Sequence, residues 1–417
     1  MRPHGVGHVL AALPGETMNH EAWKTLLAAE SLPCAIVDLD AVDHNLALLR
    51  AARAREDVTL RVATKSVRVP AVLRHLREHG GSALRGWMPW SAGETRALFE
   101  QGFDDFLMGY PVARPQEADT LAALAADGAQ VIACVDDAHH VAVLAEAARA
   151  HGTEVPVCID VDLSLRPAAG VHLGVRRSPH RDAVSVVALA RRIAEAEGVR
   201  LAAVLAYEAQ VAGLADRAPG TALKRPVLRW LKARSVALAR ERRSAVLEAL
   251  EREGHAIAVV NGGGTGSLRT TSAEAAVTEV TVGSGFLCPH LFDHYDGLPL
   301  RPAAFFALPI CRRSDPDHVT CLTGGFIASG APGPDRLPQV HSPPGLTPVA
   351  LEGWGEVQTP FRCGRDAPQL RLGDPVIARH AKAGELFEHF REVLLVRGGA
   401  VVDRVPTLRG TGWGYGG

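Results

Sequence analysis

Lys65 is a residue whose type and position could do chemistry. It follows a run of strand-forming residues, Leu60 to Ala63, and precedes a helical pattern from Ala71 to His79. Only five of the 45 basic residues are lysine, so this chain normally uses arginine where a positive charge is enough. A lysine at a strand end therefore suggests the need for an amine, which can lose its proton and attack a carbonyl. The alternative is a surface lysine with a packed stem.

Two glycine-rich turns, at 261–267 and 282–286, could bind an anion. Successive glycines let backbone N–H groups converge on one anion, and Thr265 and Ser267 add hydroxyl donors. Neither turn has the G-K-[ST] ending of a P-loop, and no G-x-G-x-x-G follows the first strand. The alternative is a pair of flexible turns without a ligand. The predicted phosphate-binding residues are Gly263, Gly264, Thr265, Gly283 and Ser284.

The elements that must position these residues alternate between strand and helix. Several strands are short, continuous apolar runs, as in parallel sheets buried on both faces. Eight strands with intervening helices favour a closed (β/α)8 TIM-type barrel, with Lys65 after its first strand and the glycine turns after its seventh and eighth. The expected strands are 59–64, 82–88, 104–110, 130–135, 155–161, 201–207, 256–260 and 277–282.

The pattern changes after about residue 286. Helical periodicity largely stops, and Pro, Gly and short β-rich runs dominate. We therefore predict an α/β chain with an N-terminal extension (1–31), a barrel domain (32–286) and a C-terminal mostly-β domain (287–417).

Composition excludes several classes of function. The formal net charge is −1 and no basic block is interleaved with aromatics, which argues against a nucleic-acid partner. No apolar run is long enough to cross a bilayer, and the first 20 residues do not resemble an export signal. The seven cysteines are scattered without a C-x-x-C pair, as expected of reduced thiols. We expect a cytoplasmic protein.

A nucleophilic lysine and a phosphate cradle at one barrel mouth together suggest a phosphate-bearing aldehyde. Pyridoxal 5′-phosphate fits, with Lys65 as its Schiff-base lysine. A barrel that binds a phosphorylated sugar, with Lys65 acting only as a charge, is the alternative.

The chain resembles the fold-type III, alanine racemase-like pyridoxal phosphate enzymes, and within them the D-threonine aldolase and D-serine dehydratase branch. The resemblance covers roughly residues 32–410. Its anchors are Pro33–Asp40 with Asn45, Lys65-Ser66-x-Arg68-x-Pro70, Ala206-Tyr207-Glu208-x-Gln210, Gly262–Ser267, Gly373–Val376 with His380, and Val396–Gly399 with Val402.

This resemblance implies roles for individual residues. Lys65 is the aldimine lysine, the glycine turns bind the cofactor phosphate, and Tyr207 lies near the cofactor ring. An arginine between Asp160 and Arg177 should approach the cofactor 3′-oxygen, with Arg166 our first choice and Arg176 the second. In the family an Arg-x-Gly-Val sequence is usual at this place, but this chain has His172-Leu173-Gly174-Val175. His172 is therefore a third candidate for the residue in the position of that arginine.

A second departure concerns a divalent metal, which the branch holds with a histidine and a cysteine or aspartate two residues later. Here the pattern is His380-Ala381-Lys382, and a protonated lysine repels a cation. Either His380 keeps the metal with help from Glu385, Glu388 or His389, or Lys382 replaces it and bonds to or protonates the substrate β-oxygen. We favour the second.

The resemblance implies a lyase that cleaves a D-configured β-hydroxy-α-amino acid to glycine, or another small amino acid, and an aldehyde. Dehydration to a 2-oxo acid and ammonia by a D-serine or D-threonine dehydratase is the first alternative, and racemisation is the second. A non-catalytic cofactor carrier is less favoured because carriers of this fold lack a second domain. A homodimer is expected by resemblance.

Overall fold

The barrel is built from eight parallel strands. The computed structural model describes residues 18–217 and 222–413, and within these the strands close in the order β2 to β9, with β9 paired to β2. The predicted barrel is confirmed. Its strands are β2 (Thr59–Ala63), β3 (Leu84–Met88), β4 (Phe106–Pro111), β5 (Val131–Val135), β6 (Val155–Asp160), β7 (Val199–Ala206), β8 (Val259–Gly262) and β9 (Glu279–Val282).

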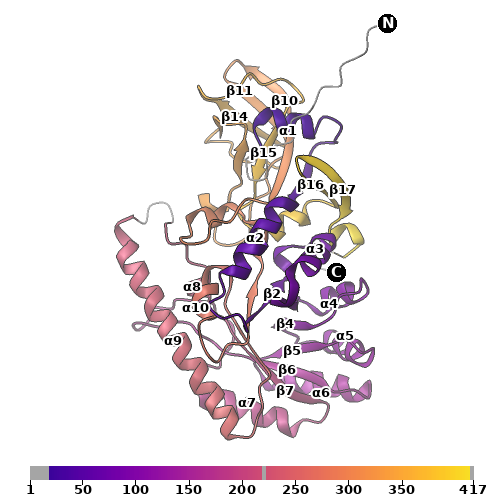
Figure 1. The fold of residues 1–417 in the computed structure, drawn as a ribbon, viewed down its shortest axis with the longest axis vertical. Coiled ribbons are helices and arrows are strands. Elements are labelled where there is room, and N and C mark those ends of the chain that lie inside the picture. The colour runs from indigo at the N-terminus through magenta and orange to yellow at the C-terminus, as the bar shows by residue number, and fades with distance from the viewer. Residues whose placement is uncertain (1–17, 218–221, 414–417) are drawn as a thin grey trace.

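Helices follow most strands and cover the outside of the barrel (Figure 1). The side chains of Ser91, Asp137 and Asp182 accept N–H groups at the starts of three of them, which is worth about 1 kcal/mol per helix. The helices are α3 (Pro70–Gly80), α4 (Ala92–Phe99), α5 (Pro115–Ala126), α6 (Ala138–Ala150), α7 (Ala183–Glu195), α8 (Ala209–Ala212), α9 (Arg225–Arg252), α10 (Leu268–Thr271) and α11 (Ser284–Leu287).

A separate sheet of nine strands forms the second domain in the described chain, in the order β13-β14-β11-β10-β1-β16-β17, with β15 paired to β10 and β12. This confirms a mostly-β domain after the barrel. Its later strands are β10 (Ala304–Asp315), β11 (His318–Leu322), β12 (Gln339–Ser342), β13 (Leu346–Pro348), β14 (Gln358–Cys363), β15 (Pro375–Arg379), β16 (Glu392–Arg397) and β17 (Ala400–Pro406).

The strand β1 (Cys34–Asp38) belongs to this second sheet, although the predicted barrel domain began at residue 32. It lies between β10, which is antiparallel to it, and β16, which is parallel. Both partners come from beyond residue 300, so a local pattern could not reveal the pairing. The helix α2 (Leu39–Ala51) then leads from the sheet toward the barrel (Figure 1).

The predicted N-terminal extension is described only from residue 18. Its helix α1 (His20–Leu26) buries Trp23 against the second sheet, with the Trp23 and Phe305 ring centroids 5.3 Å apart. Residues 1–17 lie outside the described part of the chain.

Short 3₁₀ turns complete the fold, and two of them bring the domains together. The turn η1 (Thr64–Ser66), which contains Lys65, contacts η7 (Gly384–Glu388) of the sheet domain. The other turns are η2 (Gly81–Ala83), η3 (Ala222–Lys224), η4 (Thr265–Ser267), η5 (His290–His294), η6 (Pro334–Arg336) and η8 (Arg409–Thr411).

No helix in the described residues is both long and apolar enough to span a bilayer.

Candidate active site

Lys65 lies at the carboxyl end of the barrel, two residues after β2 ends. Its side chain is exposed. The Lys65 Nζ donates to the Tyr110 hydroxyl oxygen at 2.7 Å, and Tyr110 is the penultimate residue of β4. The amine is therefore held at the barrel mouth by a partner from another strand.

Arg177 also lies against Tyr110. Its Nη2 is 3.5 Å from the Tyr110 hydroxyl, and its guanidinium carbon is 5.1 Å from the Tyr110 ring centroid and 5.7 Å from that of Tyr207. Burial raises the pKa of Tyr110, but the positive charges of Lys65 and Arg177 outweigh it, so that the pKa lies below its ordinary value. Burial, assisted by the Glu208 carboxylate, raises the pKa of Tyr207 to about 12. The Tyr207 hydroxyl thus keeps its proton.

The two glycine turns lie side by side, and next to Lys65. The Gly285 N–H donates to Thr265 Oγ1 at 3.2 Å, which joins the turn after β9 to the turn after β8. The Ser284 hydroxyl donates to Ser66 Oγ at 3.3 Å. A Cβ at Gly283 would lie 2.8 Å from the Ser66 Cβ, so the close packing of this turn requires glycine. The two glycine turns and the Lys65 amine therefore share one barrel mouth.

Buried charges hold the first glycine turn in place. Glu208 accepts a hydrogen bond from the Gly263 N–H at 3.3 Å and another from the Ser267 hydroxyl at 2.8 Å. It also pairs with Arg243, which contacts Glu274 at 2.6 Å. Removal of one partner from such a buried network costs about 3–5 kcal/mol. The turn is therefore rigid before any ligand arrives.

The sheet domain places His380 and Lys382 on a segment that continues into η7 over the barrel mouth. His380 is 2% exposed, and its Nδ1 is 2.5 Å from the Lys382 carbonyl oxygen. Burial lowers the pKa of His380 to about 4, so the imidazole is neutral at physiological pH. The Lys382 Nζ donates to Ser329 Oγ at 2.9 Å and lies 3.8 Å from the Glu385 carboxylate. Burial lowers the pKa of Lys382, and Glu385 offsets this in part.

These residues do not fit a divalent metal centre. Lys382 offers an ammonium where a ligand is needed, and its Nζ donates to Ser329 Oγ. Glu385, a candidate ligand, instead accepts hydrogen bonds from the Ser329 main chain and hydroxyl, at 2.6 and 2.9 Å. In the described residues, no group of three possible ligands includes His380. The donor set around His380 is that of a hydrogen-bonding site.

All the candidates for the residue near the cofactor 3′-oxygen lie in the irregular segment that follows β6. Arg166 is about half-exposed and its Nη2 is 3.4 Å from the Asp162 carboxylate. His172 contacts the Val175 carbonyl at 3.1 Å, and Arg176 is exposed. Arg177, at the end of the stretch considered, is the one that reaches Tyr110 and Tyr207. Neither Arg177 nor Tyr110 was singled out from the sequence, although Tyr110 ends a predicted strand.

Residues 37–287 match the family described as alanine racemase, N-terminal domain, and this match covers more than half of the chain. The chain belongs to this family. The predicted resemblance to fold-type III pyridoxal phosphate enzymes is therefore confirmed.

Individual members of the family give a narrower comparison. The chain is 26% identical to the D-threonine aldolase of Arthrobacter sp. over 90% of this chain and 92% of that protein. It is 29% identical to the 3-hydroxy-D-aspartate aldolase of Paracoccus denitrificans (strain Pd 1222) over 67% of this chain. That match spans 64% of the Paracoccus protein, less than two thirds of its length.

Solved structures of other proteins share the fold. The D-threonine aldolase from Filomicrobium marinum superposes with a TM-score of 0.77 at 21% identity, covering 92% of this chain and 96% of that one. The D-threo-3-hydroxyaspartate dehydratase from Delftia sp. HT23 superposes with a TM-score of 0.72 at 20% identity, covering 92% and 99%. Both likenesses extend through the barrel and the sheet domain.

The family depends on pyridoxal phosphate, and the residues of this barrel mouth fit that group. The exposed Lys65 amine lies beside Ser66, which contacts the second glycine turn. The Tyr207 ring lies against the first glycine turn, since a Cβ at Gly264 would be 3.4 Å from Tyr207 Cε2. The mouth thus offers an amine, an aromatic ring and two glycine turns.

Proposed function

We propose that this protein is a pyridoxal phosphate-dependent lyase that cleaves a D-configured β-hydroxy-α-amino acid to glycine, or another small amino acid, and an aldehyde. The names of its aldolase relatives support the reaction class. The single observation that supports cleavage in this chain is the neutral, buried His380 beside Lys382, on a segment packed against the main chain of Lys65.

Residues of the barrel would hold the cofactor. Lys65 would bind its aldehyde covalently, and the turns containing Gly263, Gly264, Thr265, Gly283 and Ser284 would bind its phosphate. Arg177 and Tyr207 would contact its ring, and Arg177 rather than Arg166 would approach its 3′-oxygen. When bound, pyridoxal phosphate withdraws electrons from the bonds at the substrate Cα. Tyr110 holds the Lys65 amine in place and, because its pKa is lowered, can exchange a proton with it.

His380 would act as the general base on the substrate β-hydroxyl. Its Nδ1 lies 2.5 Å from the Lys382 carbonyl oxygen and 3.0 Å from the Lys382 main-chain nitrogen, whose N–H points to it. The proposed role requires the tautomer in which Nδ1 donates to that carbonyl, so that Nε2, which is buried and has no hydrogen-bond partner among the described residues, keeps a lone pair. Loss of the β-hydroxyl proton to this lone pair starts the cleavage of the Cα–Cβ bond.

Lys382 would take the electrostatic role of a metal ion. A positive charge near the β-oxygen stabilises the alkoxide that develops as His380 removes the proton. The side chain is about 39% exposed, so it can turn from Ser329 to a substrate oxygen. A cation beside a base serves retro-aldol cleavage, because it lowers the pKa of the hydroxyl without needing to give up its own proton.

Dehydration is the second candidate, and the lowered pKa of Lys382 favours it. An ammonium that gives up its proton readily can protonate a leaving hydroxyl, while Lys65 removes the Cα proton. The products would be a 2-oxo acid and ammonia. Racemisation, the third candidate, needs no group at the β-oxygen. It would therefore give His380 and Lys382 no catalytic role.

The products distinguish these candidates. The enzyme is incubated with D-threonine, D-serine, D-phenylserine and 3-hydroxy-D-aspartate, and glycine, aldehyde, 2-oxo acid and ammonia are measured. Equal amounts of glycine and aldehyde support cleavage, whereas 2-oxo acid and ammonia support dehydration. Reaction of the L-isomers alone would contradict the proposed stereochemistry. The homodimer and the cytoplasmic location stay predictions.

A further inference from the structure

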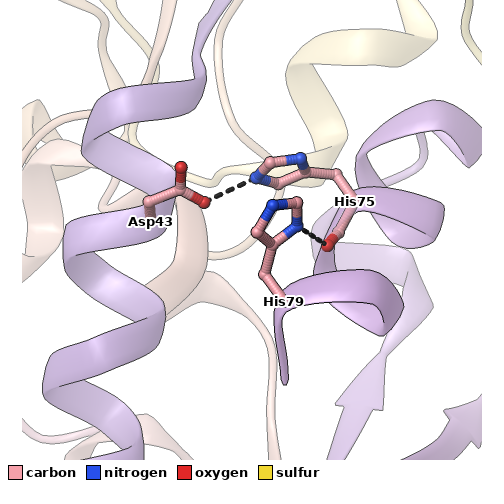
Figure 2. A group of neighbouring side chains, drawn as sticks. All are labelled: Asp43, His75 and His79. Atoms are coloured by element: carbon pink, nitrogen blue, oxygen red, sulfur yellow. Dashed lines mark hydrogen bonds and ion pairs between the residues drawn. The ribbon is translucent and has the colours of Figure 1, made fainter. Parts of the chain in front are cut away.

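Three side chains outside the barrel mouth converge on one point between α2 and α3. Asp43 comes from α2, and His75 and His79 come from α3, one helical turn apart (Figure 2). One ligand atom from each lies within 4.8 Å of the others. Residues four positions apart lie on the same face of a helix, so both imidazoles lie near the carboxylate, and His75 contacts it.

The hydrogen bonds of the cluster leave His79 Nε2 as an acceptor and place a proton between His75 Nε2 and the Asp43 carboxylate, which zinc binding would release. The His79 Nδ1 is 2.9 Å from the His75 carbonyl oxygen, so that Nδ1 holds the proton and Nε2 is left as an acceptor. The His75 Nε2 is 2.5 Å from Asp43 Oδ1. The two rings stack with centroids 4.1 Å apart and planes at 30° (Figure 2). Ring N–H donation to a main-chain carbonyl is the usual second-shell support of a metal-binding histidine.

We propose that Asp43, His75 and His79 bind a zinc ion. Two imidazoles and one carboxylate are a ligand set typical of zinc, with a fourth tetrahedral position left for water. Magnesium and calcium are not favoured, because both require mainly oxygen ligands. The site lies outside the proposed active site and does not depend on the proposed function.

Arg397 at the end of β16 competes with the ion. Its Nη2 lies 2.9 Å from Asp43 Oδ2 and 3.4 Å from His75 Nε2. The Arg397 side chain is 40% exposed, and an exposed ion pair of this kind stabilises a protein by at most about 1 kcal/mol. Zinc binding at Asp43 can therefore displace the guanidinium into solvent.

The ion would connect two helices, α2 and α3, that follow elements of different domains. The helix α2 follows β1 of the sheet domain, whereas α3 follows the turn that contains Lys65. Zinc at this point would fasten the first helix after the sheet to the first helix of the barrel. Its expected effect is on stability, through preferential binding to the folded state.

Isothermal titration of zinc chloride into the chelator-treated, full-length protein with its pyridoxal phosphate tests the proposal. We expect about one zinc ion per chain, with a raised melting temperature in its presence. His79→Ala should weaken binding by more than the loss of about 10–100-fold that follows a change of a second-shell partner. Arg397→Gln should strengthen it, because the competing cation is gone.

The matched control is His151→Ala. His151 Nε2 is 2.7 Å from the Asp119 carboxylate in a similar pair between α6 and α5, but no described residue completes a group of three there. This variant should bind zinc as the unchanged protein does. No zinc binding by the unchanged protein, or equal binding by the His79→Ala variant, would overturn the proposal. Because binding and melting are measured without substrate, neither result depends on whether the protein is a lyase.

Discussion

Gly384 of the sheet domain lies directly on the main chain of Lys65, so closely that a Cβ added at Gly384 would overlap the Lys65 carbonyl oxygen. The same carbonyl accepts a hydrogen bond from Arg68 Nε at 3.0 Å, and Arg68 pairs with Glu388 of the sheet domain at 2.8 Å. The second domain is thus in contact with the turn that holds the candidate nucleophile, and it brings His380 and Lys382 with it.

Gly384→Ala should separate cofactor binding from catalysis. Overpacking of this kind costs about 1–3 kcal/mol, and here it is relieved by displacing the 380–388 segment from the barrel mouth. We expect kcat/KM to fall about tenfold or more, while the absorbance of bound pyridoxal phosphate is retained. The control is Gly364→Ala in the same domain, where the added Cβ would meet its nearest atom at 3.1 Å. Equal activity of the two variants would refute this role of the contact.

Arg177→Gln should weaken cofactor binding more than Arg166→Gln. Arg177 lies on the rings of Tyr110 and Tyr207, whereas Arg166 is about half-exposed and pairs with Asp162. Loss of the Arg177 charge should also raise the pKa of Tyr110. A spectroscopic titration with pyridoxal phosphate measures both affinities. A larger effect at Arg166 would restore the assignment made from the sequence.

Lys382→Gln should lower kcat by about 10²–10³-fold, the usual effect of removing one electrostatic donor from a transition state. Because the Lys382 side chain contacts Ser329 and Glu385, the amount of bound cofactor should not change. Chelator should not lower the activity of the unchanged protein at 25 °C, even if it lowers the melting temperature by removing zinc from Asp43, His75 and His79.

Lys382→Asp provides the complementary experiment. This change places a carboxylate two residues after His380, as the metal-binding branch requires, and removes the repelling ammonium. Added Mn²⁺ should then increase the low activity of the variant and leave the unchanged protein unaffected. If Mn²⁺ instead activates the unchanged protein and chelator abolishes its activity, Lys382 does not replace a metal.

The pH profile tests the role of His380. A general base must be deprotonated, and the lowered pKa keeps His380 neutral down to about pH 4. We therefore expect kcat, measured at saturating substrate, to stay level between about pH 5.5 and 8 rather than to fall near 6.5, the ordinary histidine value. His380→Gln should lower kcat at every pH in that range. A fall of kcat centred near 6.5 that disappears in this variant would contradict the buried, neutral state.

The sequence was sufficient to predict the barrel because its strands and helices alternate locally. It also placed Lys65 and both glycine turns correctly at strand ends, since the end of a parallel strand is visible in the pattern itself. The partners of these residues were not predictable in the same way. Tyr110 is 45 positions from Lys65, and Arg177 reaches the barrel mouth from an irregular segment after β6.

Contacts between segments far apart in the sequence account for the other differences between the predictions and the structure. β1 has the apolar pattern of any buried strand, and only its pairing with β10 and β16 places it in the second sheet. Similarly, the spacing of His75 and His79 was present in the sequence, but Asp43 joins them only because α2 packs beside α3. Helical spacing alone could not have distinguished a metal site from a solvated helix face.

The central claim is that the Lys65 amine binds pyridoxal phosphate covalently, and borohydride reduction followed by peptide mass mapping tests it most directly. The account predicts one reduced phosphopyridoxyl adduct, on the peptide that contains Lys65, and none on the peptides with Lys24, Lys224, Lys232 or Lys382. An adduct on another lysine, or no adduct in a protein that has bound the cofactor, would contradict it.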